Sequence, residues 1–219
     1  MTLVKICGLR TIEHARVAAE AGADFLGMIF APARRQVGLA DAAAIARAAH
    51  AAGPARVVGV FVNEAPERIL EIAAECELDA VQLSGDEPIA WARELAGRTL
   101  LKAVRLDQAP VEAEWLAAEL PGVHLLVDAH APGAYGGTGV LADWDRAARL
   151  ARRRPIVLAG GLTPENVGAA IRQVRPWCVD VSSGVETAGA KDAEKIRAFI
   201  RAARLADAGI PTHSGRCDS

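Results

Sequence analysis

The sequence lacks the features that would point to a nucleic acid or a membrane as a partner. Lysine and arginine number 25 and aspartate and glutamate 27, so neither sign of charge dominates and the net charge is -2. No apolar run reaches the roughly 18–20 residues of a membrane-spanning helix, and no basic stretch followed by an apolar one marks a signal peptide. The run Arg152–Arg154 is interpreted as a solvated helix C-terminus. We therefore expect a cytoplasmic protein that binds neither nucleic acid nor membranes.

Cysteines are few and are not grouped. Cys7, Cys76, Cys178 and Cys217 form no Cys-x-x-Cys motif, so neither a zinc site nor a redox-active dithiol is predicted. In a cytoplasmic protein these thiols stay reduced. A chain of 219 residues also needs no disulfide to hold a core together.

The sequence does contain one repeated pattern, in which short apolar runs alternate with longer amphipathic stretches. The apolar runs are rich in Val, Ile, Leu and Phe, as strands covered on both faces are. The predicted strands are Val4–Cys7, Phe25–Phe30, Val57–Val62, Ala80–Leu83, Leu100–Val104, His124–Asp128, Pro155–Ala159 and Cys178–Val181. The predicted helices are Ile12–Ala21, Ala42–Ala52, Pro66–Cys76, Ile89–Ala96, Glu112–Leu120, Trp144–Arg152, Pro164–Val174 and Asp192–Leu205.

This order of elements predicts an α/β fold. Strands separated by helices pair in parallel through right-handed crossovers. An open, doubly wound sheet is compatible with the order, but eight complete units without a second domain favour closure into a single (βα)8 TIM barrel. We expect the barrel over residues 1–206 and a short, polar, disordered C-terminal tail over residues 207–219.

The active site of such a barrel lies at the C-terminal ends of its strands, where the first strand carries Lys5 and Cys7. Because side chains alternate along a strand, these two residues share one face and should point into the barrel. Cys7 is then either a small buried hydrophobe or a functional thiol beside a cation. Asp180 interrupts the eighth strand, which adjoins the first in a closed barrel. We hypothesise that Asp180 pairs with Lys5 there.

A second candidate is Asp128, which ends the sixth predicted strand. A carboxylate that closes an apolar strand costs free energy unless it is paired or used. Asp128 therefore either caps the following loop or takes part in chemistry. The glycine-rich segment 132–139 comes next, and it either folds over a ligand or merely connects.

Small residues follow the last two strands, at Gly160-Gly161 and at Ser182-Ser183-Gly184. Glycines let backbone N–H groups approach an anion, and barrels often hold phosphate in the loops after strands seven and eight. The two loops therefore indicate a phosphate site, with tight turns as the alternative.

From about residue 3 to residue 205 the chain resembles the phosphoribosylanthranilate isomerase family. The last two motifs in the sequence are the most specific. The matching segments are Val4–Gly8, Gly59–Asn63, Val81–Leu83, Tyr135–Gly139, Leu158–Val167 and Val179–Glu186.

The resemblance implies a fold and a reaction: a barrel that catalyses the Amadori rearrangement of phosphoribosylanthranilate in tryptophan biosynthesis. It implies that Cys7 is the general base, that Asp128 is the general acid and that Arg35 binds the anthranilate carboxylate, with Arg34 as the competing assignment. It further implies that Gly160, Gly161, Ser183 and Gly184 cradle the phosphate and that Ser182 lines the approach to them. No redox step occurs, so we expect no cofactor and no metal. The expected partner is a small phosphorylated substrate, and the expected assembly is a monomer or homodimer.

Two positions depart from the usual family pattern: Ser84, where histidine is common, and Gln36, where an aromatic residue is common. Both bear on affinity for the aromatic end of the substrate. The alternatives are indole-glycerol-phosphate synthase, the histidine-pathway isomerase, or a non-catalytic phosphosugar-binding protein. The first needs a lysine acid and glutamates that have no clear place here, and the second typically carries aspartate where this chain has Cys7.

Overall fold

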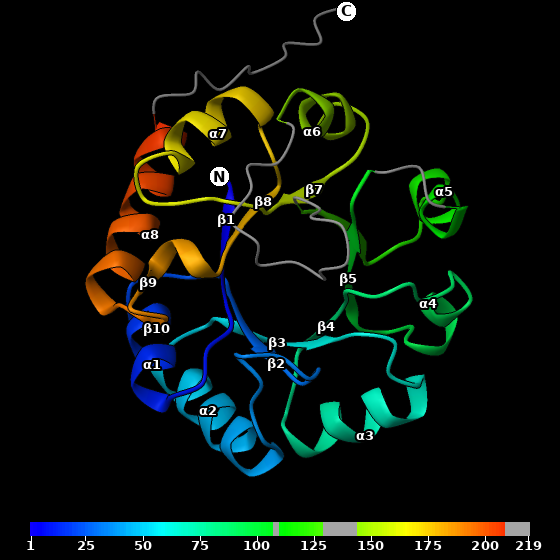
Figure 1. Cartoon of the computed structure of the whole chain (residues 1–219), viewed down its shortest axis with the longest axis horizontal. Coiled ribbons are helices and arrows are strands. Elements are labelled where there is room, and N and C mark those ends of the chain that lie inside the picture. Colours follow the sequence, from blue (N-terminus) through cyan, green and yellow to red (C-terminus); the bar gives the residue numbers. More distant parts are fainter. Residues whose placement is uncertain (107–109, 129–143, 209–219) are drawn as a thin grey trace, which may run out of the picture.

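The computed structural model describes residues 1–106, 110–128 and 144–208 (Figure 1). Its main strands are β1 (Leu3–Cys7), β2 (Phe25–Ile29), β3 (Arg56–Phe61), β4 (Ala80–Leu83), β5 (Thr99–Val104), β6 (Val123–Val127), β7 (Ile156–Leu158) and β8 (Cys178–Val181). Its helices are α1 (Ile12–Glu20), α2 (Leu39–Ala52), α3 (Pro66–Glu75), α4 (Trp91–Glu94), α5 (Pro110–Ala117), α6 (Trp144–Ala151), α7 (Val167–Val174) and α8 (Ala193–Ala208).

The eight strands pair in parallel, each with the next, and β8 pairs with β1 to close the barrel. Figure 1 shows the strands at the centre with the helices in a ring around them. The predicted TIM barrel is confirmed. No helix within the described ranges is long and apolar enough to cross a membrane.

Two apolar clusters explain why the strands are apolar on both faces. One fills the inside of the barrel and the other lies between the strands and the helices. The inner cluster consists of Phe25, Val58, Ala80, Leu101, Leu126, Val157, Ala159 and Cys178. Val4 and Ile6 belong to the outer cluster, so the alternation along β1 directs Lys5 and Cys7 inward, as predicted.

Helices α2 and α5 begin earlier than predicted, at Leu39 and Pro110. Two others, α4 and α7, begin two or three residues later than predicted, because local hydrogen bonds compete with the helix. The residues before α4 form backbone hydrogen bonds between residues three apart, such as Trp91 N to Pro88 O. This is the pattern of a 3-10 turn, and it leaves α4 short. We expected the seventh helix to begin at Pro164, but α7 begins at Val167. The side chain of Asn166 instead accepts from Thr163 N and donates to Gly161 O, which holds this segment as a turn.

One feature was not predicted, a small hairpin after β8. A short 3-10 helix, η1 (Ser183–Val185), leads into β9 (Glu186–Thr187) and β10 (Ala190–Lys191), which pair antiparallel. Ala188 and Gly189 form the turn with positive φ angles of 50° and 79°, which a tight two-residue hairpin requires.

Helix α8 continues through Ala208 and so takes in the first two residues of the predicted tail. Asp207 is anchored, since its carboxylate accepts hydrogen bonds from the backbone and hydroxyl of Thr2 at 2.6 and 2.9 Å. Residues 209–219, for which a disordered tail was expected, lie outside the described residues, as does the glycine-rich segment 132–139.

Candidate active site

Lys5, Asp180 and Cys7 meet inside the barrel near its C-terminal mouth. Lys5 Nζ donates to Asp180 Oδ1 at 3.0 Å, and both side chains are buried. The pair is a direct result of barrel closure, because the register of β1 and β8 sets Lys5 opposite Asp180. The predicted ion pair is therefore confirmed.

Gly27 on β2 makes room for this group. A Cβ at Gly27 would lie 3.0 Å from Cys7 Sγ and 3.2 Å from Lys5 Nζ, closer than nearly all real Cβ contacts. The thiol and the ammonium thus pack directly against the backbone of β2. The sequence prediction missed Gly27, although a glycine in the middle of an apolar strand is a signal of close approach.

Two opposing effects act on the pKa of Cys7. Burial raises the pKa of the thiol above its ordinary value, and this effect prevails. The positive charge of Lys5 lowers it in part, and Lys191 contributes in the same direction. Burial also tends to lower the pKa of Lys5, but Asp180 and Cys7 raise it overall, so Lys5 stays a cation.

Asp128 directly follows β6 and lies at the same end of the barrel as Cys7. Its backbone N–H donates to Val104 O on β5, and its side chain is partly exposed. Because Leu126, two residues earlier, belongs to the inner cluster, the alternation along the strand directs Asp128 toward the mouth.

The two small-residue loops are in backbone contact. A Cβ at Gly184 would lie only 1.9 Å from Leu162 O, so only glycine lets the loop after β8 pack against the loop after β7. Gly160 and Gly161 have φ angles of 88° and 64°, which are strained for other residues. The two loops thus form one continuous rim of small residues beside β1.

Arg35 and Arg34 share a carboxylate that the sequence prediction did not single out. Arg35 donates to Glu186 through Nε at 2.6 Å and Nη2 at 3.1 Å, and Arg34 donates through Nη2 at 2.8 Å. The Arg35 side chain is 14% exposed and that of Arg34 54%. Lys191, on β10, adds a third cation at 3.0 Å from Glu186 and also donates to Ser182 O at 2.8 Å.

We refer to Arg34, Arg35, Glu186 and Lys191 as the arginine–glutamate cluster. Burial raises the pKa of Glu186, but the hydrogen bonds from Arg35, Arg34 and Lys191 together outweigh it and lower the pKa to about 2. The carboxylate therefore stays ionised at neutral pH. One negative charge against three positive charges leaves this edge of the mouth cationic, which suits an anionic ligand.

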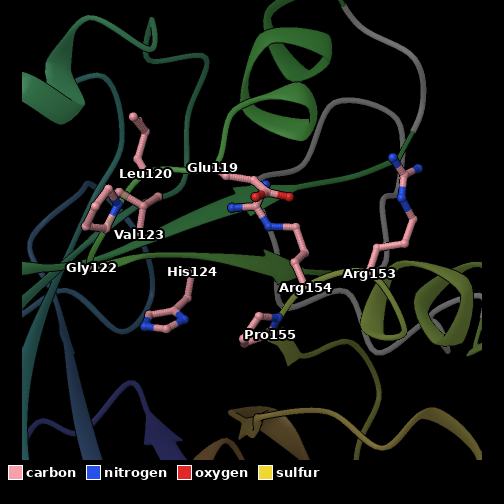
Figure 2. Close-up of a pocket in the computed structure, with 9 residues that line it drawn as sticks. Glu119, Leu120, Gly122, Val123, His124, Arg153, Arg154 and Pro155 are labelled. Atoms are coloured by element: carbon pink, nitrogen blue, oxygen red, sulfur yellow. The ribbon is translucent and has the colours of Figure 1, made fainter.

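A hollow of about 360 Å³ lies at the other end of the barrel (Figure 2). Its lining comes from residues before β6 and β7 and from His124 at the start of β6. From the sequence, Arg154 is interpreted as part of a solvated helix C-terminus. The structure gives it a further contact, because its Nη1 donates to Trp115 O and Ala118 O at the C-terminus of α5. This end of a barrel serves stability rather than chemistry, so we do not assign the site there.

No group of three or more His, Cys, Asp or Glu side chains in the described segments could hold a metal ion. The residues gathered at the mouth are instead a thiol, carboxylates, cations and glycine loops, a set suited to proton transfer on an anionic substrate.

The closed parallel barrel and this polar mouth define the class, a (βα)8-barrel enzyme. The particular family follows from comparison: a family model described as N-(5'phosphoribosyl)anthranilate (PRA) isomerase matches residues 4–202. The chain belongs to the N-(5'-phosphoribosyl)anthranilate isomerase family.

Individual relatives agree over nearly the whole chain. An N-(5'-phosphoribosyl)anthranilate isomerase from Roseiflexus sp. (strain RS-1) is 58% identical over 94% of this chain and 99% of its own. The crystal structure of phosphoribosyl anthranilate isomerase from Thermotoga maritima superposes with a TM-score of 0.82 at 40% identity, covering 94% of this chain and all of that one.

A further phosphoribosyl anthranilate isomerase structure holds reduced 1-(o-carboxyphenylamino)-1-deoxyribulose 5-phosphate. It matches with a TM-score of 0.79 at 39% identity, covering 94% of this chain and all of that one.

Proposed function

We propose that this chain isomerises N-(5'-phosphoribosyl)anthranilate to 1-(2-carboxyphenylamino)-1-deoxyribulose 5-phosphate, a step of tryptophan biosynthesis. Membership of the isomerase family supports the reaction. The observation that supports the assignment of roles is that Cys7 ends β1 and Asp128 directly follows β6, two strands that open into one mouth.

Asp128 is the general acid in this proposal. It protonates the ring oxygen of the ribose, and the C1–O bond breaks as the nitrogen lone pair forms an iminium. The partly exposed position of Asp128 at the end of β6 lets the carboxyl group exchange its proton with solvent between turnovers.

Cys7 is the general base. The iminium makes the proton on the second sugar carbon acidic, the Cys7 thiolate removes it, and the resulting enolamine tautomerises to the ketone. A thiolate beside a buried cation is stabilised, and Lys5 supplies that cation. Because burial still raises the pKa of Cys7 overall, activity should increase with pH into the alkaline range.

The two anionic groups of the substrate, its phosphate and its ring carboxylate, are assigned to different parts of the mouth. The phosphate is assigned to Gly160, Gly161, Ser183 and Gly184, with Ser182 lining the approach, and the positive φ angles and loop contact support this. The carboxylate is assigned to Arg35, which is buried deeper than Arg34 and lies against Gly8, next to Cys7.

Turnover tests the proposal directly. Purified protein is mixed with freshly prepared phosphoribosylanthranilate, and the loss of substrate fluorescence is followed. Cys7→Ala should lose activity, whereas the matched variant Cys178→Ala, which removes a buried thiol deeper in the barrel, should keep it. Binding without turnover by the intact protein would favour a non-catalytic phosphosugar-binding role.

We also expect a cytoplasmic monomer or homodimer without a nucleic-acid partner. The near-neutral net charge supports the last expectation. Light scattering on the purified protein distinguishes monomer from dimer.

A further inference from the structure

We propose that Glu186 is a positioning residue, which orients Arg35 so that one edge of its guanidinium is presented to the carboxylate of the substrate. The inference rests on the proposed function, because it takes the anthranilate carboxylate as the ligand of Arg35. It goes beyond that function in assigning a role to the hairpin formed by β9 and β10.

The geometry of the contact is the first observation. A guanidinium has two edges that can each bind a carboxylate through paired hydrogen bonds: a side-on edge, Nε with Nη2, and an end-on edge, Nη1 with Nη2. Glu186 takes the side-on edge of Arg35, through Oε1 to Nε at 2.6 Å and Oε2 to Nη2 at 3.1 Å. Among the described residues nothing accepts a hydrogen bond from Nη1 of Arg35. The end-on edge therefore remains for a second carboxylate.

The position of Arg35 is the second observation. A Cβ at Gly8 would lie 2.7 Å from Arg35 Cδ and 3.2 Å from Ser182 Oγ. The stem of Arg35 thus lies on the backbone that follows Cys7, beside the residue that begins the loop after β8. Gly8 has a φ of 78°, so a glycine is required there on both conformational and steric grounds. Glu186 and Gly8 together fix the guanidinium near the proposed base.

The charge balance is the third observation. Arg34 and Lys191 also donate to Glu186, and Arg34 Nη1 donates to Gly189 O at 2.6 Å in the hairpin turn. Because these two cations hold the carboxylate from other sides, Glu186 stays in place when Arg35 binds a substrate. Three cations around one carboxylate also leave net positive charge for the incoming anion.

The test compares two inhibitors in the full-length protein. One is reduced 1-(o-carboxyphenylamino)-1-deoxyribulose 5-phosphate, and the other is the same compound without the ring carboxylate. Their affinity ratio in each variant isolates the contribution of the carboxylate. In Glu186→Gln the ratio should fall by about tenfold, since a misdirected guanidinium loses its charge-assisted hydrogen bonds to the ligand. KM should rise by a similar factor while kcat changes by less than about threefold.

Three further variants sharpen the result. Arg35→Met should lower the ratio as well, and adding Glu186→Gln to it should lower the ratio no further, because the second residue acts through the first. Glu186→Asp keeps the charge but shortens the side chain. In this variant the affinity ratio should fall, but by less than in Glu186→Gln. Glu87→Gln is the matched control, since it neutralises a buried carboxylate that is also paired with a lysine, and it should leave the ratio unchanged.

An unchanged affinity ratio in Glu186→Gln would overturn the inference. If both inhibitors also bind more weakly by the same factor, Glu186 has a purely structural role, and if neither affinity changes, it has no role in binding. If Glu186→Gln does not fold, an unchanged ratio in Glu186→Asp would overturn it instead. An intact protein that prefers the carboxylated inhibitor but turns over no substrate would refute the proposed reaction while leaving this role of Glu186 standing.

Discussion

Two buried lysine–carboxylate pairs lie in the barrel wall, on opposite faces of it. Lys5 and Asp180 face the interior, at 3.0 Å. Lys102, on β5, faces outward, and its Nζ lies 2.6 Å from Glu87 Oε2 and 2.6 Å from Gly85 O. Both lysines are almost fully buried. The chemistry of the pairs is alike, so the difference between them lies in their surroundings.

The outer pair forms hydrogen bonds with two loops and one helix. Glu87 accepts from Asn63 N at 3.0 Å and from Gly85 N at 2.8 Å, so it joins the loops after β3 and β4. Trp115 of α5 donates to Glu87 O. These contacts satisfy both charges within the protein, as a structural ion pair requires.

The inner pair has a thiol as its neighbour and lacks a comparable set of backbone hydrogen bonds among the described residues. Cys7 lies beside Lys5, and the positive charge of Lys5 lowers the pKa of its thiol in part. The two pairs differ in the face of the barrel wall that they occupy, and in the proposed mechanism the outer pair serves stability while the inner pair, beside Cys7, serves chemistry. The predictions below test that separation.

The largest effect is expected at the mouth itself. Cys7→Ala and Asp128→Ala should each lower kcat by about 10³-fold or more, because each removes a proton-transfer group. Stability should change little. Steady-state kinetics and thermal unfolding together check this, and a near-normal rate in either variant would reassign that residue's role.

Lys102→Met should act on stability and not on chemistry. It leaves Glu87 buried without a counter-charge, which costs about 3–5 kcal/mol. Urea unfolding measures the loss, and turnover per folded molecule should stay within about threefold of the original value. A selective loss of turnover would instead show that the outer pair serves the reaction.

Lys5→Met should act on chemistry as well as on stability, because it also leaves the carboxylate of Asp180 buried without a counter-charge. Removing the cation raises the pKa of Cys7 further, so less thiolate is present at neutral pH. We expect kcat/KM near pH 7 to fall by about 10–100-fold and the rise of activity with pH to shift to higher pH. An unchanged pH profile in this variant would remove Lys5 from the proposed role.

The smallest expected effect concerns the arginine–glutamate cluster at low pH. The pKa of Glu186 in the folded protein is about 2, below the value of roughly 4.3 for an unfolded chain. Its stabilising contribution is therefore complete above about pH 5 and is lost as the pH falls toward 2, on the order of 2 kcal/mol. Glu186→Gln should flatten this part of the stability curve, which denaturant unfolding at several pH values measures.

Much of this arrangement could be predicted from the sequence. The alternation of apolar and amphipathic segments predicts the barrel, and the period of two along β1 directs Lys5 and Cys7 inward. Closure of the barrel then places Asp180 next to Lys5. These predictions depend on regular geometry, which the sequence pattern encodes.

The parts that could not be predicted depend on contacts between distant loops. Strands β9 and β10 have two residues each, too few for any periodicity, and the only local signal is Gly189. The partners of Arg35 follow from this hairpin, so the arginine–glutamate cluster was missed. Lys102 was likewise missed, although a lysine on the helix-facing side of an apolar strand indicates a buried acid nearby.

The most direct test of the central claim is a crystal structure of this protein with reduced 1-(o-carboxyphenylamino)-1-deoxyribulose 5-phosphate. We predict that Cys7 Sγ lies within about 3.5 Å of the second sugar carbon, with the Asp128 carboxylate on the opposite side of the sugar and the phosphate on the rim formed by Gly160, Gly161 and Gly184. A ligand bound with its sugar away from both Cys7 and Asp128, or with its phosphate at the other end of the barrel, would contradict the proposed mechanism.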